Sequence, residues 1–242
     1  MKILTVDIGN THTKTAIFED NKLLSNCIVH SIDEFAKYVC QNKPQVACIC
    51  SVGADVFQHL ELLKSDSITT FHLTHQLHLP FQIDYSTPHT LGMDRVAAVA
   101  GALHFFPNKS CLIIDAGTCI TYDFIENGIT YRGGAIAPGL EMRLQAMHQF
   151  TQKLPKPDLH WPENFEGKST NTSLLSGACI GILDEIDGKI DRYKSRYGDV
   201  KVLICGGNAE LLSKHTKNNI FAEPLLVLYG LNKIAQFHVN KS

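Results

Sequence analysis

The chain has 242 residues, of which 44% are hydrophobic, and its formal net charge is −2. This length and composition predict a globular protein with one large or two small domains. The charge provides no basic surface for nucleic acid and no polybasic anchor for a membrane, so we expect neither of those partners and a small-molecule ligand instead.

The first predicted element is an apolar strand at the N-terminus, which ends in the sequence VDIGNTHTK at residues 6–14. Asp7 interrupts the apolar run before it reaches the length of a signal peptide, and no later run is long enough to span a membrane. The eight cysteines lie mostly in apolar segments and are predicted to be reduced core residues. These features predict a cytoplasmic protein.

A polar bend follows this strand, and it is too long for a two-residue hairpin turn. Its Gly, Thr and Asn residues offer backbone N–H groups and hydroxyls to an anion, and glycine lets a phosphate approach closely. Lys14, at the start of the return strand, adds positive charge. The bend predicts phosphate binding, and the alternative is a turn in which Asp or Thr side chains satisfy backbone donors.

Helices are predicted from capping signals and from apolar residues at three- and four-residue spacing. Ser31 and Glu34 are spaced as a capping box at the start of the first helix. The predicted helices lie at residues 31–42, 93–106, 138–150 and 173–198. Two further buried strands end on glycine, at residues 46–53 and 200–206, and a helical segment follows each of them.

Two short runs contain residues that bind metals in other proteins. His72, His75 and His78 recur at every third position, and Cys48 and Cys50 form a close pair. Nothing nearby completes either set of ligands, so surface or core residues are the preferred interpretation.

The sequence around residue 115 repeats that of the first strand and bend. Residues 4–24 align with residues 112–130 if the first copy has one extra residue. Each copy has an apolar strand, a D-x-G bend, a return strand, a tight turn and a third strand. Two such bends that face each other could clamp a triphosphate, while their carboxylates would hold Mg²⁺, its waters or another cation. The alignment pairs Asp7 with Asp115, Gly9 with Gly117 and Glu19 with Glu126.

The two bends and the sequence LICGGNAELL, where an adenosine would lie, resemble the acetate and sugar kinase, Hsp70 and actin superfamily. Within it, the segments DIGNTHTK, LGMDR, IDAGTCITYD and GGAIAPGLEMRLQAMHQFTQKLP are similar to the type III pantothenate kinases. The resemblance implies an α/β fold of two similar ribonuclease H-like halves, a duplicated actin-like ATPase fold with a central nucleotide cleft. The halves would be residues 1–106 and 107–242.

The resemblance also implies the activity, which is ATP-dependent phosphorylation of pantothenate to 4′-phosphopantothenate, the first step of coenzyme A biosynthesis. Asp94 would be the general base that accepts the proton of the substrate hydroxyl, although the residues alone favour a helix N-cap or first-turn acid. A monovalent cation, K⁺ or NH₄⁺, would be the metal bound at Asp115, and Mg²⁺ would accompany ATP. Thr118 and Asp115 could otherwise only satisfy the turn.

The remaining site residues follow from the same resemblance. Thr172 would reach pantothenate from the neighbouring subunit of a homodimer, although it could otherwise belong to a helix N-cap cluster. ATP would be bound by Asp7, Ile8, Gly9, Asn10, Thr11, His12, Thr13, Lys14 and Thr118. Pantothenate would be bound by Tyr85, Gly92, Met93, Asp94, Arg95 and Thr172.

Two other functions stay open on the sequence alone. A different small-molecule kinase of the superfamily, acting on a sugar or a short acid, would share both phosphate bends without needing the GMDR segment. A non-enzymatic ATP-binding regulator would need a DNA-binding module or a basic face, and the sequence shows neither. The family's second bend commonly has alanine where this chain has Cys119, a nearly isosteric change that we expect to leave activity intact.

Overall fold

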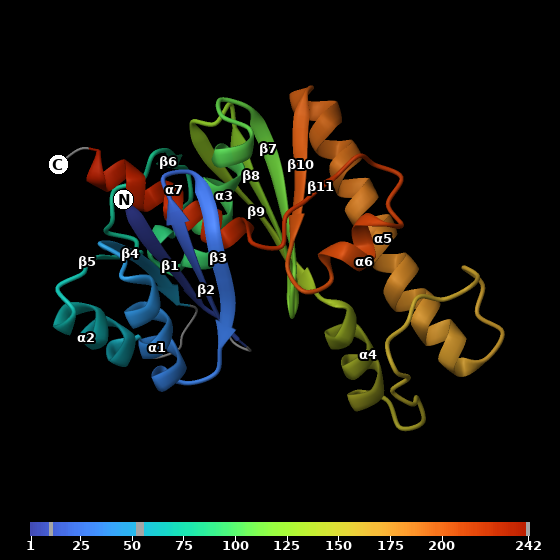
Figure 1. Ribbon diagram of the computed structural model, residues 1–242. Coiled ribbons are helices and arrows are strands. Elements are labelled where there is room, and N and C mark those ends of the chain that lie inside the picture. The colour runs from blue at the N-terminus through green and yellow to red at the C-terminus, as the bar shows by residue number, and fades with distance from the viewer. Residues whose placement is uncertain (10–11, 52–55, 241–242) are drawn as a thin grey trace. The chain divides into compact units, whose positions relative to one another are not determined.

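Two sheets with closely similar strand orders organise the chain (Figure 1). The computed structural model describes residues 1–9, 12–51 and 56–240. The chain divides into two compact units. Unit 1 contains residues 1–109, 125–133 and 225–242, and unit 2 contains residues 110–124 and 134–224.

Unit 1 is built on a sheet with the order β3-β2-β1-β4-β5. Its strands are β1 (Lys2–Ile8), β2 (Thr13–Glu19), β3 (Lys22–Val29), β4 (Val46–Ser51) and β5 (Thr69–His72). Its helices are α1 (Ile32–Asn42), α2 (Phe57–Ser65), the single 3₁₀ turn η1 (Pro88–Thr90), α3 (Met93–Phe105) and α7 (Leu226–Val239). The central strand β1 pairs antiparallel with β2 and parallel with β4.

The two faces of β1 pack against different helices because successive side chains of a strand point to opposite faces. Leu4, Val6 and Ile8 share a buried cluster with Phe35 and Val39 of α1. Helix α7 also contacts β1 and β4. Asp7 alternates with Val6 and Ile8, so it lies on the face of the sheet opposite to the α1 cluster.

Helix α7 joins unit 1 by packing closely against α3. A Cβ atom at Gly230 would lie 1.7 Å from the carbonyl oxygen of Ala97, so the two backbones are in direct contact at this point. A Cβ atom at Gly101 would likewise lie 2.2 Å from the carbonyl oxygen of Leu226. The compact units therefore do not follow the chain continuously. The predicted halves, residues 1–106 and 107–242, describe the repeat of the sequence and stay a prediction.

Unit 2 is built on strands in the order β9-β8-β7-β10-β11. Its strands are β7 (Ser110–Ala116), β8 (Cys119–Glu126), β9 (Thr130–Pro138), β10 (Val200–Cys205) and β11 (Phe221–Ala222), and its helices are α4 (Leu140–Gln149), α5 (Thr170–Tyr197) and α6 (Ala209–Ser213). The tip of the β8–β9 hairpin belongs to unit 1, where β6 (Gln82–Ile83) pairs with β9.

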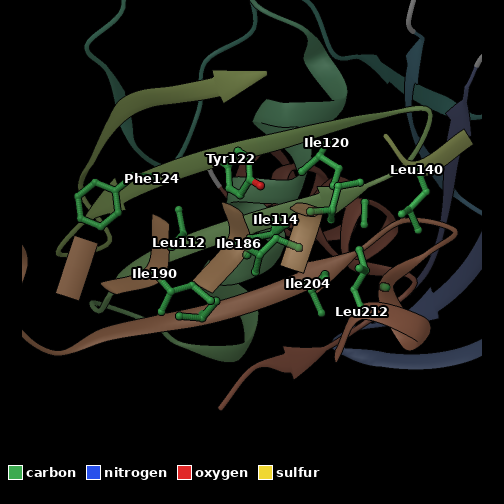
Figure 2. Packing of buried hydrophobic residues seen from close by; sticks show 14 of the residues in the cluster. Leu112, Ile114, Ile120, Tyr122, Phe124, Leu140, Ile186, Ile190, Ile204 and Leu212 are labelled. Atoms are coloured by element: carbon green, nitrogen blue, oxygen red, sulfur yellow. The ribbon is translucent and has the colours of Figure 1, made fainter. Parts of the chain in front are cut away.

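The core of unit 2 lies between its sheet and helix α5 (Figure 2). Ile114 of β7 and Tyr122 of β8 belong to one buried cluster with Ile186 and Ile190 of α5. Leu212 of α6 completes the cluster beside β10. These residues recur at strand and helix spacing, which is why the sequence pattern predicted the elements that carry them.

The predicted internal repeat is confirmed by the topology. In both copies a strand, a bend and a return strand are followed by a third strand beside the return strand, and a later strand pairs parallel with the first. The tight turn of the second copy is the predicted Asn-Gly hairpin turn, because Asn127 and Gly128 have φ angles of 53° and 68°.

The helix predictions are confirmed, with corrections at their starts. The Ser31 hydroxyl accepts a hydrogen bond from the backbone N–H of Glu34 at 3.2 Å, as a capping box requires. The Glu34 carboxylate, however, accepts from the N–H of His30 instead of Ser31. Helix α4 begins at Leu140 because Pro138 is the last residue of β9.

Candidate active site

The first predicted phosphate bend connects β1 to β2. The backbone N–H of Gly9 donates to the carbonyl oxygen of His12 at 3.1 Å, so this donor closes the bend and is not directed to a ligand. His12 is exposed, and Thr13 and Lys14 are partly buried at the start of β2. Two further predicted ATP ligands, Asn10 and Thr11, lie outside the described residues, as does Gly53 at the end of the predicted strand 46–53.

Ile8 is a predicted ATP-binding residue whose side chain packs in the protein interior. Its side chain is only 4% exposed and belongs to the core cluster of unit 1. Any contact of Ile8 with a ligand would therefore use its backbone atoms.

Asp7 is a partly buried carboxylate flanked by polar side chains on both neighbouring strands. Lys14 of β2 and Cys50 of β4 are its direct partners across the sheet. The Cys50 thiol donates a hydrogen bond to Oδ1 of Asp7 at 3.5 Å. Burial raises the pKa of Asp7 to about 6, an effect that Cys50 and Lys14 oppose and that the negative charge of Asp94 reinforces.

The second bend repeats this geometry in unit 2. The N–H of Gly117 donates to the carbonyl oxygen of Cys119 at 3.1 Å, as Gly9 does in the first bend. Thr118, at the tip, is exposed and can present its hydroxyl to a ligand. The Asp115 carboxylate lies beside the turn after β10, where a Cβ atom on Gly206 would come within 2.3 Å of its Oδ1. The Asp115 carboxylate therefore occupies space that only glycine leaves open.

The GMDR segment forms the start of α3 in unit 1. Gly92 is the N-cap residue and Asp94 lies in the first helical turn, so Asp94 is a first-turn acid and not the N-cap. Its Oδ1 accepts a hydrogen bond from the backbone N–H of Arg95 at 2.9 Å. A Cβ atom on Gly92 would lie 2.5 Å from the same oxygen. The carboxylate thus occupies space that only glycine leaves open.

Arg95 follows Asp94 and is 7% exposed. A buried guanidinium requires polar partners to offset the cost of removing it from water. Arg95 makes such interactions within the fold. Met93, the first residue of α3, is half-buried.

Tyr85 lies just beyond β6 and is held by strand pairing to β9. The carboxylate of the neighbouring Asp84 forms an ion pair with the guanidinium of Arg132 at 2.7 Å. The backbone N–H of Asp84 donates a hydrogen bond to the carbonyl oxygen of Tyr131. A Cβ atom on Gly133 would lie 3.2 Å from the ring of Tyr85, and Gly133 has a φ angle of 83°. Gly133 is thus a strand residue that packs against the tyrosine ring.

Thr172 caps the start of α5, as the alternative interpretation proposed. Its hydroxyl accepts hydrogen bonds from the backbone N–H groups of Lys168 and Ser169 at 3.0 and 2.9 Å. Its own N–H donates to the Ser169 hydroxyl at 3.2 Å, which completes a capping box. Thr172 is exposed on unit 2, and its hydroxyl also donates to the carbonyl oxygen of Ser169 at 3.2 Å.

The predicted site residues are distributed over both units. Unit 1 holds the first bend, Tyr85 and the start of α3, and unit 2 holds Asp115, Thr118 and Thr172. Within unit 1 the fold brings Asp7 close enough to Asp94 for their charges to interact. The sequence interpretation missed Cys50 as a partner of Asp7, and only the pairing of β1 with β4 identifies it.

The described residues contain no group of three or more His, Cys, Asp and Glu side chains that could hold a metal ion, and this includes His72, His75 and His78. Two carboxylates, those of Asp7 and Asp115, are nevertheless suited to contact a cation that binds together with a phosphate ligand. Asp7 is a partly buried carboxylate whose one hydrogen bond from a described side chain comes from a thiol, and the Asp115 carboxylate packs against Gly206 and next to Gly117 of the second bend. Hard cations prefer such oxygen ligands.

No helix among the described residues is long and apolar enough to cross a membrane. All eight cysteines are free. Five of them, Cys48, Cys50, Cys111, Cys179 and Cys205, are buried, as predicted for core residues.

The duplicated topology with its two D-x-G bends defines a class of protein, the two-unit nucleotide-binding α/β fold of small-molecule kinases. A ROK family glucokinase from Streptomyces griseus, solved with glucose and AMPPNP, matches 98% of this chain and 100% of its own at a TM-score of 0.58 and 12% identity. A conserved, proposed Baf family transcriptional activator from Campylobacter jejuni matches 98% and 99% at a TM-score of 0.64 and 23% identity. At these identities the similarity shows a shared fold alone.

Sequence comparison gives the particular family. The model of the type III pantothenate kinases matches residues 3–192. Type III pantothenate kinases from Flavobacterium johnsoniae and Christiangramia forsetii are 38% and 40% identical to the chain. These matches cover 98% and 97% of this chain and 99% and 98% of theirs. The chain belongs to the type III pantothenate kinase family.

Proposed function

We propose that this chain transfers the γ-phosphoryl group of ATP to the primary hydroxyl of pantothenate. The product, 4′-phosphopantothenate, is formed in the first step of coenzyme A biosynthesis. The observation that carries the proposal is the near full-length similarity to type III pantothenate kinases, at 38–40% identity over 97–98% of the chain. The position of Asp94 at the start of a helix, beside a glycine that gives its carboxylate room, supports the same reaction.

Asp94 is proposed as the general base. The pantothenate hydroxyl would attack the γ-phosphorus in line, and its proton would pass to the carboxylate of Asp94. This carboxylate lies in the first turn of α3, next to the partial positive charge of the helix N-terminus. Such a base contributes a factor of about 10²–10⁴, and positioning with charge stabilisation supplies the larger part of the rate.

The two bends are proposed to bind ATP. In unit 2 the exposed hydroxyl of Thr118 would contact a phosphate oxygen. In unit 1 the segment His12–Lys14 would contribute the charge of Lys14 and the polar atoms of the bend, together with Asn10 and Thr11. The Asp7 carboxylate would accept hydrogen bonds from the water shell of Mg²⁺, an ion that neutralises phosphate charge when bound.

Asp115 is proposed to bind a monovalent cation, K⁺ or NH₄⁺. The position of the Asp115 carboxylate, against Gly206 and next to Gly117 of the second bend, supports this assignment. A single carboxylate suits a singly charged ion, because a divalent ion usually requires more than one anionic ligand.

Pantothenate is proposed to bind at Tyr85 and at the segment Gly92–Arg95, with Thr172 added from the neighbouring subunit of a homodimer. Several large apolar side chains of unit 2 are exposed, which favours a partner that covers them. Phe150 and Phe165 are 81% and 72% exposed, and the Phe165 carbonyl accepts a hydrogen bond from Ser176 near the start of α5. The exposed Phe165 is thereby tied to the helix that begins at Thr172.

We further propose that the enzyme acts in the cytoplasm. All eight cysteines are free, and five of them are buried in the core. Reduced cysteines are typical of proteins that work in a reducing compartment.

The experiment that tests the function measures ADP release from Mg-ATP in K⁺ buffer, with and without pantothenate. We expect pantothenate-dependent turnover, and we expect the variant Asp94→Asn to lose at least about 100-fold in kcat. Asp33→Asn is the matched control, since Asp33 is an acid in the first turn of α1. It removes a first-turn charge without touching the proposed site.

Two outcomes would contradict the proposal. If pantothenate failed to stimulate ADP release although Mg-ATP bound, the acceptor would be another hydroxyl or carboxylate compound. If Asp94→Asn and Asp33→Asn lowered kcat equally, Asp94 would be a helix-stabilising acid and not the base.

Replacing K⁺ with Na⁺ in the same assay tests the proposed monovalent cation at Asp115, because the proposal expects a large loss of turnover.

A further inference from the structure

We propose that Cys50 is a positioning residue, whose thiol holds the carboxylate of Asp7 in the orientation that binds Mg-ATP. This inference deepens the proposed function and depends on it for the role of Asp7. The hydrogen bond itself can be tested without any assumption about the reaction.

The position of Cys50 is set by the sheet and not by the local sequence. Cys50 and Asp7 are direct partners in the parallel pairing of β4 with β1. Their side chains therefore project to the same face of the sheet. Cys50 is 0% exposed, and its Sγ atom lies 3.5 Å from Oδ1 of Asp7. This separation is within the usual range for a hydrogen bond that involves sulfur.

The thiol acts as a donor because it remains protonated. Burial is the main reason that the pKa of Cys50 is raised well above its usual range, and the negative charge of Asp7 adds to it. A neutral thiol is a weak donor that is buried at little cost. Cys50 can thus fix one oxygen of Asp7 while adding no charge that would compete with a cation.

Asp7 needs such a partner because its carboxylate is largely removed from water. Within the described residues, Cys50 is the side chain that donates to it. With Oδ1 held by Cys50, the second oxygen is left to accept hydrogen bonds from a hydrated cation. Loss of the thiol would free the carboxylate to rotate toward Lys14, its partner on β2. Rotation would misalign the oxygen that faces Mg-ATP.

Three substitutions in the full-length chain test this inference. Cys50→Ala removes the donor, and Cys50→Ser retains a donor at the same position. Cys48→Ala is the matched control, because Cys48 is equally buried on the same face of β4 but pairs with Thr5. The two alanine substitutions remove the same atoms from neighbouring positions of one strand, so packing losses should be similar.

Calorimetric titration with Mg-ATP is the first measurement. Cys50→Ala removes a hydrogen bond to a charged group, and the energy of this bond is small because a thiol is a weak donor. We therefore expect Kd to rise about three- to tenfold in this variant. Cys50→Ser should restore Kd to within about twofold of the wild type, and Cys48→Ala should leave it unchanged. In turnover, Cys50→Ala should raise KM for Mg-ATP more than it lowers kcat. Equal effects of the two alanine variants on Kd would overturn the inference.

A second measurement separates the inference from the proposed function. Unfolding equilibria of Cys50→Ala, Asp7→Asn and the double variant form a cycle that reports the contact between the two side chains. If the two side chains are hydrogen-bonded, the fold-change in the unfolding equilibrium constant of the double variant should differ by about threefold or more from the product of the fold-changes of the two single variants. If the fold-changes simply multiply, the contact is refuted. A wild-type chain that binds no Mg-ATP would instead overturn the proposed function, and the role of Cys50 in it, whatever the cycle shows.

Discussion

The substitution Asp7→Asn should stabilise the fold at neutral pH. Asp7 is a partly buried carboxylate whose pKa is raised from 3.8 to about 6, mainly by desolvation. Above pH 6 the folded protein must hold this charge away from water, whereas the unfolded chain holds it in water. The cost corresponds to about 3 kcal/mol and is absent below about pH 4, where both states are protonated.

The pH dependence of stability follows from the same values. Between about pH 4 and 6 the folded state retains the proton that the unfolded state has lost, so stability decreases as pH rises through this range. Asparagine has no such proton. The stability of Asp7→Asn relative to the wild type should therefore increase by about 2 kcal/mol between pH 4.5 and 7.5.

Urea unfolding of the ligand-free wild type and Asp7→Asn at several pH values measures this difference. At pH 7.5 we expect the variant to be more stable by about 1–3 kcal/mol, a net value that already includes the attraction between Asp7 and Lys14. Asp33→Asn serves as the control for removal of an exposed carboxylate. A variant that is less stable than the wild type at pH 7.5, or a difference that does not change with pH, would refute the reasoning.

Protonation of Asp7 should also weaken the binding of Mg-ATP at acidic pH. A cation near Asp7 favours the ionised carboxylate, so Kd should rise as pH falls below about 6, by up to about tenfold per pH unit. Titration calorimetry at pH 5, 6 and 7.5 measures this change. Asp7→Asn should bind weakly at all three pH values.

Three further substitutions test the geometry of the site. Gly92→Ala places a Cβ atom 2.5 Å from Oδ1 of Asp94, so kcat should fall about 10- to 100-fold through misplacement of the base, whereas KM for ATP in steady-state assays should not change. Gly133→Ala puts a Cβ atom against the Tyr85 ring on a backbone with a φ angle of 83°; KM for pantothenate should rise and thermal unfolding should show a loss of about 1 kcal/mol or more. Ser169→Ala removes the N-cap of α5, which should lower stability in urea by about 1 kcal/mol without changing KM for ATP, and unchanged stability would contradict the capping role.

Much of the fold follows from local patterns. Apolar residues at strand spacing predicted β1 and β7, and the Asn127-Gly128 turn predicted the hairpin between β8 and β9. These elements depend on side-chain alternation and on the φ angles that particular residues adopt, and both can be recognised in a short stretch of sequence. The internal repeat was evident for the same reason.

The candidate site was predictable only in part. Resemblance to a family identified Asp94 and the two bends, but it did not indicate that the N–H of Gly9 is used within its own bend. It also assigned Ile8 to ATP, although its side chain packs in the core of unit 1. Such details depend on which backbone groups and which faces remain accessible after the strands have paired.

The sequence by itself determined the duplicated α/β topology, the two D-x-G bends and the family, since each is written in contiguous residues. Only the tertiary structure decided the contact between Cys50 and Asp7, the glycine beneath Tyr85 and the packing of α7 against α3. These contacts join residues far apart in the chain. Their geometry is set by strand register and by the close approach of backbones, which no local pattern encodes.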